Sequence, residues 1–180
     1  MTGGAYTAKE TMGITNEGTV ENGSYTAETG AMTITNRGKL SSGTYTAKAG
    51  TMGITNQGTI ENGTYTAGGA LTYEGSADSE ASETTMTGAS VDITNAGTLT
   101  NGSYTAEIGA MTITNRGKLS SGTYTAKDDL TYTDSEDASL SGSEFTSEEG
   151  NVDVNAKGQL AIKKLAAKGN AKIEAAGDAT

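Results

Sequence analysis

Residues 22–48 read NGSYTAETGAMTITNRGKLSSGTYTAK, and the stretch returns at residues 101–127 as NGSYTAEIGAMTITNRGKLSSGTYTAK. The two copies match at 26 of 27 positions, and they differ only where Thr29 becomes Ile108. Such identity indicates an internal duplication, and short repeats of fixed period are typical of solenoid folds. The period of this repeat therefore decides the fold class.

The motif YTA marks a repeat of about 20 residues. The motif begins at Tyr6, Tyr25, Tyr45, Tyr65, Tyr104 and Tyr124. Successive copies are therefore separated by steps of 19, 20, 20, 39 and 20 residues. The 39-residue step spans two repeats, because Thr85-Met86-Thr87 replaces TYT there. Phe145 takes the Tyr place after Tyr124. The chain thus holds about eight coils and a partial one.

A second marker, ITN-x-G, lies within the repeat and predicts a turn. Asn can hydrogen-bond its own turn, and Gly can supply positive φ. Because Asn recurs at one place per coil, we expect a stacked amide ladder. This predicted turn ladder comprises Asn16, Asn36, Asn56, Asn95, Asn115, Gly18, Gly38, Gly58, Gly97 and Gly117.

Each coil contains three extended pieces of about three to five residues, separated by Gly, Asn and Ser. Alternation along a strand turns Met, Ile, Leu or Val, Tyr and Ala inwards and Thr or Ser outwards. The predicted core ladder comprises Tyr25, Met32, Ile34, Leu40, Tyr45, Ile54, Ile60, Tyr65, Tyr104, Ile113, Leu119 and Tyr124. The predicted outward contact face comprises Thr26, Thr44, Thr46, Thr64, Thr66, Thr105, Thr123 and Thr125.

One coil cannot bury its apolar side alone, but stacked coils can. The predicted fold is an all-β parallel β-solenoid, or β-helix, with about 20 residues and three short strands per coil. At ~4.8 Å per coil the rod is roughly 40 Å long.

Composition agrees with a thin core. Of the 180 residues 26 are Gly, none is Pro, Cys, His or Trp, and 33% are hydrophobic. This low apolar content also allows disorder, but the regular apolar positions favour the solenoid. The net charge of −10 argues against a nucleic-acid partner. We expect no membrane span and no ordinary signal peptide, since the chain has no long apolar run and no basic start followed by an apolar region.

We predict a single solenoid domain over 1–180, with regular coils at 1–127, an acidic loop-bearing coil at 128–150, and degenerate terminal coils with a basic tail at 151–180. The acidic stretches 74–83 and 128–149 suggest variable loops of about 10–15 residues. Residues 159–168, QLAIKKLAAK, contain good helix formers. A strand is favoured there, because Leu165 and Ala167 occupy the places of Tyr and Ala in the YTA motif.

Coils of the form AMTITNRGKLSSGTYTA resemble the right-handed β-helix repeats of bacterial surface proteins, autotransporter passengers and phage virion fibres. The resemblance covers nearly the whole chain, most clearly 6–66 and 85–127. It implies a right-handed solenoid, but such coils serve as rods, adhesins and enzyme scaffolds alike. The missing signal sequence departs from the autotransporter pattern and favours a virion or filament component.

The sequence contains few candidate catalytic residues. Without His or Cys we expect no ordinary triad, no thiolate metal site and no cofactor. A depolymerase could use the acids Asp92 and Asp153, or the loop acids Asp134, Glu136 and Asp137. The run DSED at 134–137 could also bind calcium, but it lacks the spacing of known calcium loops.

The sequence therefore predicts a structural, non-catalytic rod or fibre protein that assembles as a trimer, as a head-to-tail filament, or on a larger particle such as a phage virion. The expected location is a virion or the cell exterior. One alternative is a glycan-binding adhesin or depolymerase. A second is an ice-binding protein, because the outward Thr-x-Thr pairs resemble the ice-binding face of solenoid antifreeze proteins.

Overall fold

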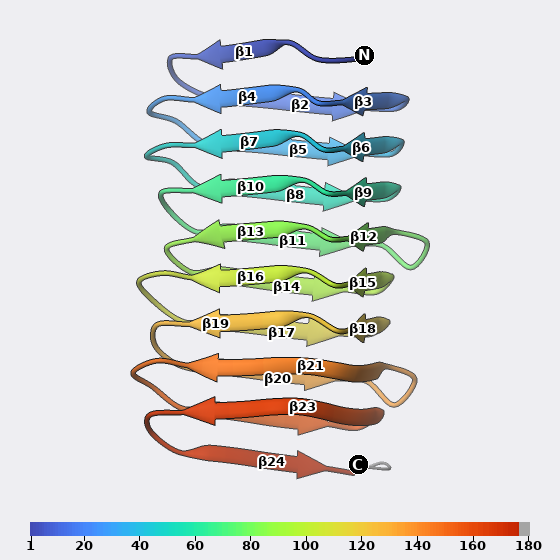
Figure 1. Ribbon diagram of the computed structural model, residues 1–180, viewed down its shortest axis with the longest axis vertical. Helices are drawn as coiled ribbons and strands as arrows, with labels where there is room; N and C mark the ends of the chain where they lie inside the picture. The colour runs from blue at the N-terminus through green and yellow to red at the C-terminus, as the bar shows by residue number, and fades with distance from the viewer. Residues whose placement is uncertain (177–180) are drawn as a thin grey trace.

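The computed structural model describes residues 1–176, which form one continuous column of stacked coils (Figure 1). About nine turns follow one another along the long axis, each of about 20 residues. Every paired strand is parallel to its neighbour, and no helix occurs among the described residues. The predicted all-β parallel β-solenoid is therefore confirmed.

The strands fall into three rows. The YTA row contains β1 (Ala5–Ala8), β4 (Ser24–Ala27), β7 (Thr44–Ala47), β10 (Thr64–Ala67), β13 (Thr85–Gly88), β16 (Ser103–Ala106) and β19 (Thr123–Ala126). The ITN row contains β2 (Met12–Asn16), β5 (Met32–Asn36), β8 (Met52–Asn56), β11 (Leu71–Gly75), β14 (Val91–Asn95), β17 (Met111–Asn115), β20 (Leu130–Asp134), β22 (Val152–Ala156) and β24 (Ala171–Ala175). The short row contains β3 (Thr19–Glu21), β6 (Lys39–Ser41), β9 (Thr59–Glu61), β12 (Glu80–Ser82), β15 (Thr98–Thr100) and β18 (Lys118–Ser120).

The last coils join two rows in single strands. β21 (Ser139–Ser147) pairs with both β18 and β19, and β23 (Gln159–Ala167) pairs with β21 along its length. The YTA and short rows therefore belong to one 15-stranded sheet, which faces the nine-stranded ITN sheet. The prediction of three strands per coil is wrong for these coils, which have two, because backbone pairing between β21 and β23 continues on both sides of the bend, with a register shift there.

The bend between the short and YTA rows uses a left-handed residue. Six residues that are not glycine have φ between 51° and 54° there: Asn22, Ser42, Asn62, Glu83, Asn101 and Ser121. Gly142 takes this place in β21, with φ of 63°. The sequence prediction had assigned positive φ to the glycines of ITN-x-G, and this is wrong. Apart from Gly18 in the first coil, those glycines are needed because a carbonyl of the neighbouring coil lies against them: a Cβ on Gly38 would collide with the carbonyl oxygen of Gly18.

The core lies between the two sheets. All twelve predicted core-ladder residues are buried, and the most exposed, Tyr25, retains 5% of its surface. Tyr6 is the exception among the YTA tyrosines, with 42% exposed, because it lies in the first coil and has a neighbouring coil on one side only.

Degenerate repeats keep the register. Met86 pairs with Tyr65 and Tyr104, and Phe145 pairs with Tyr124. Leu165 pairs with Phe145 in β23, so the segment 159–168 is a strand and not a helix up to Ala167. Residues 177–180 of the predicted terminal coil lie outside the described residues.

The acidic stretches are not long loops, and that prediction is wrong. Half of residues 74–83 and most of residues 128–149 belong to strands, because their alternating residues continue the core. The connections β11–β12 and β20–β21 have four residues each, against two in the regular coils. They project slightly from one edge of the rod (Figure 1).

Figure 1 also gives the hand of the solenoid. The YTA row lies nearer the viewer and runs leftwards, the ITN row lies behind it and runs rightwards, and the chain descends. This sense is right-handed, as parallel crossovers usually are.

Candidate functional site

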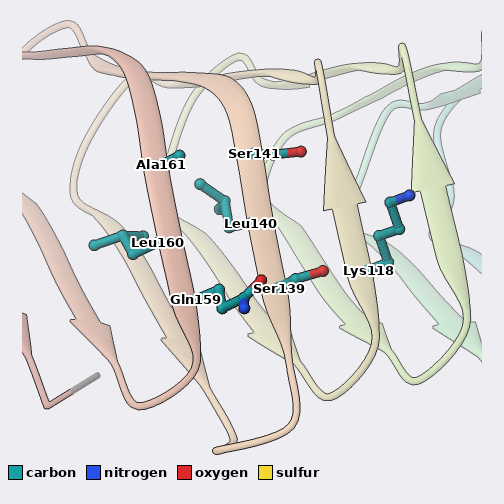
Figure 2. A pocket seen from close by; sticks show the side chains of 7 residues that line it. All are labelled: Lys118, Ser139, Leu140, Ser141, Gln159, Leu160 and Ala161. Carbon is teal, nitrogen blue, oxygen red and sulfur yellow. The ribbon is translucent and has the colours of Figure 1, made fainter. Parts of the chain in front are cut away.

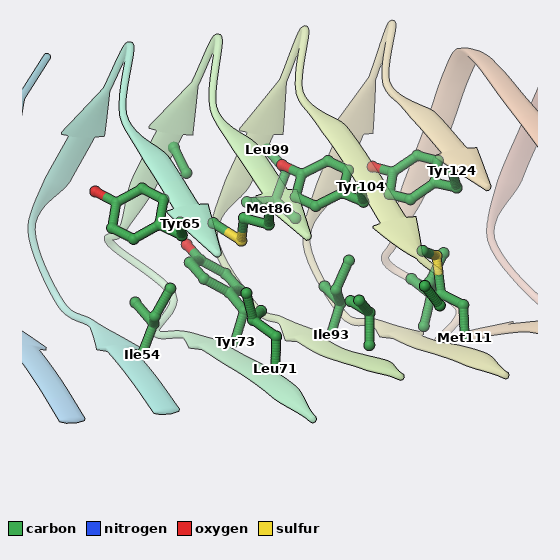
Figure 3. Packing of buried hydrophobic residues seen from close by; sticks show 14 of the residues in the cluster. Ile54, Tyr65, Leu71, Tyr73, Met86, Ile93, Leu99, Tyr104, Met111 and Tyr124 are labelled. Carbon is green, nitrogen blue, oxygen red and sulfur yellow. The ribbon is translucent and has the colours of Figure 1, made fainter. Parts of the chain in front are cut away.

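Stacked tyrosine rings position the YTA row. Ring centroids are 5.0 Å apart between Tyr25 and Tyr45, and 4.8 Å apart between Tyr45 and Tyr65, with planes within 4° of parallel. Met86 interrupts the column between Tyr65 and Tyr104, where Tyr73 of the ITN row lies below it (Figure 3). The column holds each YTA strand at a fixed height and orientation, so its outward residues are also aligned.

A glycine two positions before each of these tyrosines makes room for the ring. A Cβ on Gly43 would lie 2.7 Å from Cε2 of Tyr45, well inside the contact distance of carbon atoms. Where the tyrosine is replaced, the glycine is replaced as well: Thr84 precedes Met86. The sequence prediction missed this pairing, although the joint loss of Gly and Tyr in one coil was a signal for it.

Burial keeps the tyrosines neutral. The hydroxyls of Tyr45, Tyr65 and Tyr124 have no hydrogen-bond partner among the described residues. Removal from water raises the pKa of each of these three phenols well above its usual range, because the phenolate would be left unsolvated. These groups are therefore structural and cannot act as bases near neutral pH.

The predicted amide ladder forms inside the ITN turns. Nδ2 of Asn16 donates to Oδ1 of Asn36 at 2.8 Å, and Nδ2 of Asn36 donates to Oδ1 of Asn56 at 2.8 Å. A second ladder joins Asn95 to Asn115 at 2.9 Å. Each Nδ2 also donates to a carbonyl of its own turn and to a carbonyl of the next coil. These buried amides hold the turns in place and present no reactive group at the surface.

Tyrosine hydroxyls end both ladders. Asn56 donates to the hydroxyl of Tyr73, and Asn115 donates to that of Tyr132, each at 3.2 Å. The two coils that contain Tyr73 and Tyr132 carry Tyr where the other coils have Ile or Val, and they have the longer turns. The larger side chain reaches the space in which an Asn would otherwise lie.

Asp134 belongs to this turn structure and not to a calcium loop. Its Oδ2 accepts the Tyr132 hydroxyl at 3.0 Å, and its Oδ1 accepts the backbone N–H of Gly158 at 3.1 Å and that of Lys157. Both carboxylate oxygens are thus occupied by protein donors. Within residues 1–176 no group of three or more acids could hold a metal ion.

The other candidate acids do not form a pair. Asp92 and Asp153 occupy the same place in the ITN row, but Thr112 and Thr131 lie between them in the stack. Three coil steps of ~4.8 Å separate them by about 14 Å. That exceeds the separation at which two carboxylates cooperate in glycoside hydrolysis.

The outward side of the YTA row forms a face that we call the hydroxyl face. It comprises Ser24, Thr26, Thr44, Thr46, Thr64, Thr66, Thr85, Thr87, Ser103, Thr105, Thr123 and Thr125. The first residue of each pair is exposed and the second is half-buried. The eight predicted contact residues therefore lie together on one face.

The hydroxyl face differs from the rest of the surface. It carries no charged side chain, whereas the outward positions of the ITN row include Glu74, Asp92 and Asp153. The Ser and Thr hydroxyls that do bond to protein groups lie elsewhere, for example those of Thr29 and Ser147. Within residues 1–176 none of the twelve hydroxyls of the face bonds to a protein group, so they are left to the solvent.

Two hollows on the surface contain few ionisable groups. Figure 2 shows one of about 480 Å³ where β18, β21 and β23 meet, lined by Lys118, Ser139, Leu140, Ser141, Gln159, Leu160 and Ala161. Its one ionisable group is a lysine. Another, of about 370 Å³, opens on the core side chains of the first coil, among them Met1, Tyr6, Met12, Ile14 and Val20.

Comparisons with protein-family models, with curated proteins and with solved structures found no match to this chain. Among residues 1–176 there is no helix of the length and apolarity that crossing a membrane requires. What the chain does has therefore to be inferred from its own side chains.

Proposed function

We propose that this chain is a structural, non-catalytic rod that assembles with itself or with a larger particle, such as a phage virion or an extracellular filament. The observation that carries the proposal is the uninterrupted in-register stack of coils 1 to 9. Backbone hydrogen bonds, tyrosine rings and amides repeat along one axis, so bending the rod would strain many contacts at once. Stiffness along a single axis is the property that a spacer or fibre needs.

The first coil supports assembly through an end. Strands β1 and β2 each end their row, so each pairs with one described strand only. Tyr6 and Met1 expose 42% and 56% of their surfaces beside the hollow at this end. Unpaired strand edges above an apolar interior are a ready surface for another coil.

The resemblance to right-handed β-helix repeats is compatible with a virion or filament component, since such repeats occur in phage virion fibres, but it does not by itself separate a rod from a catalytic scaffold. Surface ion pairs between coils, such as Lys48 with Glu28 at 2.8 Å, are exposed and contribute little stability. The folded stack of coils should therefore survive moderate salt.

Analytical ultracentrifugation over a wide concentration range, followed by electron microscopy, tests this function. We expect an elongated particle that forms larger, uniaxial assemblies as its concentration rises. Tyr6→Lys should suppress these assemblies, while Lys9→Ala in the same coil serves as a control that leaves them intact. A compact monomer at every concentration would contradict the proposal.

A further inference from the structure

The structural role makes no use of the hydroxyl face, yet this face is the most regular part of the surface. Its second column is Thr in all six coils, and Thr7 and Thr146 continue this column into the coils on either side of the face. In the fifth coil the neighbouring Tyr and Ala become Met86 and Gly88, but Thr87 remains. The outward residue is thus retained where the inward residues of the same strand change.

The face has a two-dimensional repeat. Successive rungs are 4.8 Å apart where ring stacking measures them, between Tyr45 and Tyr65. The two hydroxyl residues of one rung are ~6.7 Å apart, because they are two positions apart in a strand. Thr side chains are stiff at χ1, and the stacked strands fix their backbone, so the pattern of hydroxyl and methyl groups is preformed.

A second copy of the chain does not suit this face. Six rungs of ~4.8 Å and four residues of ~3.3 Å cover roughly 380 Å². A stable interface buries about 800 Å² on each partner. The face also lacks the aromatic rings on which sugars stack, since the Tyr rings of coils 2–4, 6 and 7 point into the core.

The matching partner is a rigid lattice of hydrogen-bonding groups. Water molecules joined tetrahedrally by hydrogen bonds of ~2.75 Å place second neighbours ~4.5 Å apart, and the puckered layers of this net repeat every ~7.3 Å. The difference of ~0.3 Å per rung adds up to ~1.5 Å over six rungs, less than one lattice step. A charged group would hold its own hydration shell and break this match, and the face has none.

We propose that the hydroxyl face binds ice. The unpartnered hydroxyls hydrogen-bond to water in the ice surface, and the Thr methyl groups lie in the hollows between them. Adsorbed rods force the ice front to curve between them, which lowers the temperature at which the crystal grows. This activity is independent of the proposed assembly, because it uses the side of the rod and not its ends.

The test measures thermal hysteresis and the uptake of the protein into slowly growing ice. We expect a gap between melting and freezing temperatures and enrichment of the protein in the ice fraction. Thr66→Lys places a long cation at the centre of the face and should abolish most of both effects. Thr55→Lys is the matched control, because Thr55 is a half-buried outward residue of an ITN strand, next to the last residue of that strand, and it should leave both effects unchanged.

Two further measurements keep the outcome clear. Thr64→Lys repeats the test at an exposed position, and circular dichroism checks that each variant is folded. Exclusion of the unmodified protein from ice, or an equal loss in Thr66→Lys and Thr55→Lys, would overturn the proposal. Neither result would bear on assembly through the ends, which ultracentrifugation measures separately.

Discussion

Coil 3, residues 43–62, and coil 5, residues 84–101, have the same strand register but different interiors. Coil 3 pairs Gly43 with Tyr45, whose ring stacks on both neighbouring rings. Coil 5 pairs Thr84 with Met86, and the ring column stops there. The solenoid thus tolerates a changed interior when the residues that share one space change together. Four tests can break or sharpen this comparison.

Alkaline pH should have the largest effect, because it acts on several regular coils at once. Unfolded Tyr has a pKa of about 10. Burial raises the pKa of Tyr45, Tyr65 and Tyr104 above this value. Above pH ~10 the unfolded chain therefore loses protons that the folded chain keeps, so stability is full below that pH and falls as the pH rises.

Each buried Tyr that remains protonated should cost up to about 1.4 kcal/mol per pH unit above pH ~10. Urea unfolding at a series of pH values from 8 to 11.5 measures the total. Absorbance of phenolate provides the control, since ionisation should accompany unfolding. In a Tyr6→Phe background, which removes the exposed ring of the first coil, phenolate that appears in the folded protein at pH ~10 would show that the remaining rings are not buried.

Tyr45→Asp should be the most damaging single substitution, with a loss of more than about 4 kcal/mol. It removes a ring that is fully buried and leaves a carboxylate without a partner. Tyr45→Met, which copies coil 5, is the control and should cost about 1–2 kcal/mol. Urea unfolding compares the two, and equal losses would mean that the position tolerates charge.

Asn36→Ala should have a smaller effect, about 2 kcal/mol, because it breaks two amide-to-amide bonds in the middle of a ladder. Asn95→Ala should cost about 1 kcal/mol less. Asn95 makes one such bond, and its Oδ1 has no partner among the described residues. Thermal unfolding of both variants checks this order, and the reverse order would contradict the ladder.

Much of the fold could be predicted because it repeats. Tyr25, Met32 and Leu40 alternate with polar residues at one period, so their burial and pairing follow from sequence alone. The bend at Asn22 could not be found in this way, since Ser42 and Glu83 occupy the same place and share no chemical signature. The short loops were missed because acidity was taken as a sign of exposure, whereas alternating residues of 71–75 and 139–147 remain buried.

The candidate site could be predicted only as a pattern. Alternation placed Thr44 and Thr46 outwards, and the structure aligns them with their equivalents. Their freedom from protein partners depends on rotamers and neighbours that sequence does not give. The role of Asp134 was also out of reach, because two of its three donors lie 23 and 24 residues further along the chain.

A double-mutant cycle in coil 3 tests the central claim that glycine and tyrosine form one unit. The cycle compares Gly43→Thr, Tyr45→Met and the double substitution, which copies Thr84 and Met86 of coil 5. We predict that Gly43→Thr costs more than about 2 kcal/mol beside Tyr45 but less than about 1 kcal/mol beside the Met substitution. If Gly43→Thr costs the same in both backgrounds, glycine and tyrosine are not coupled and this account of the coil is wrong.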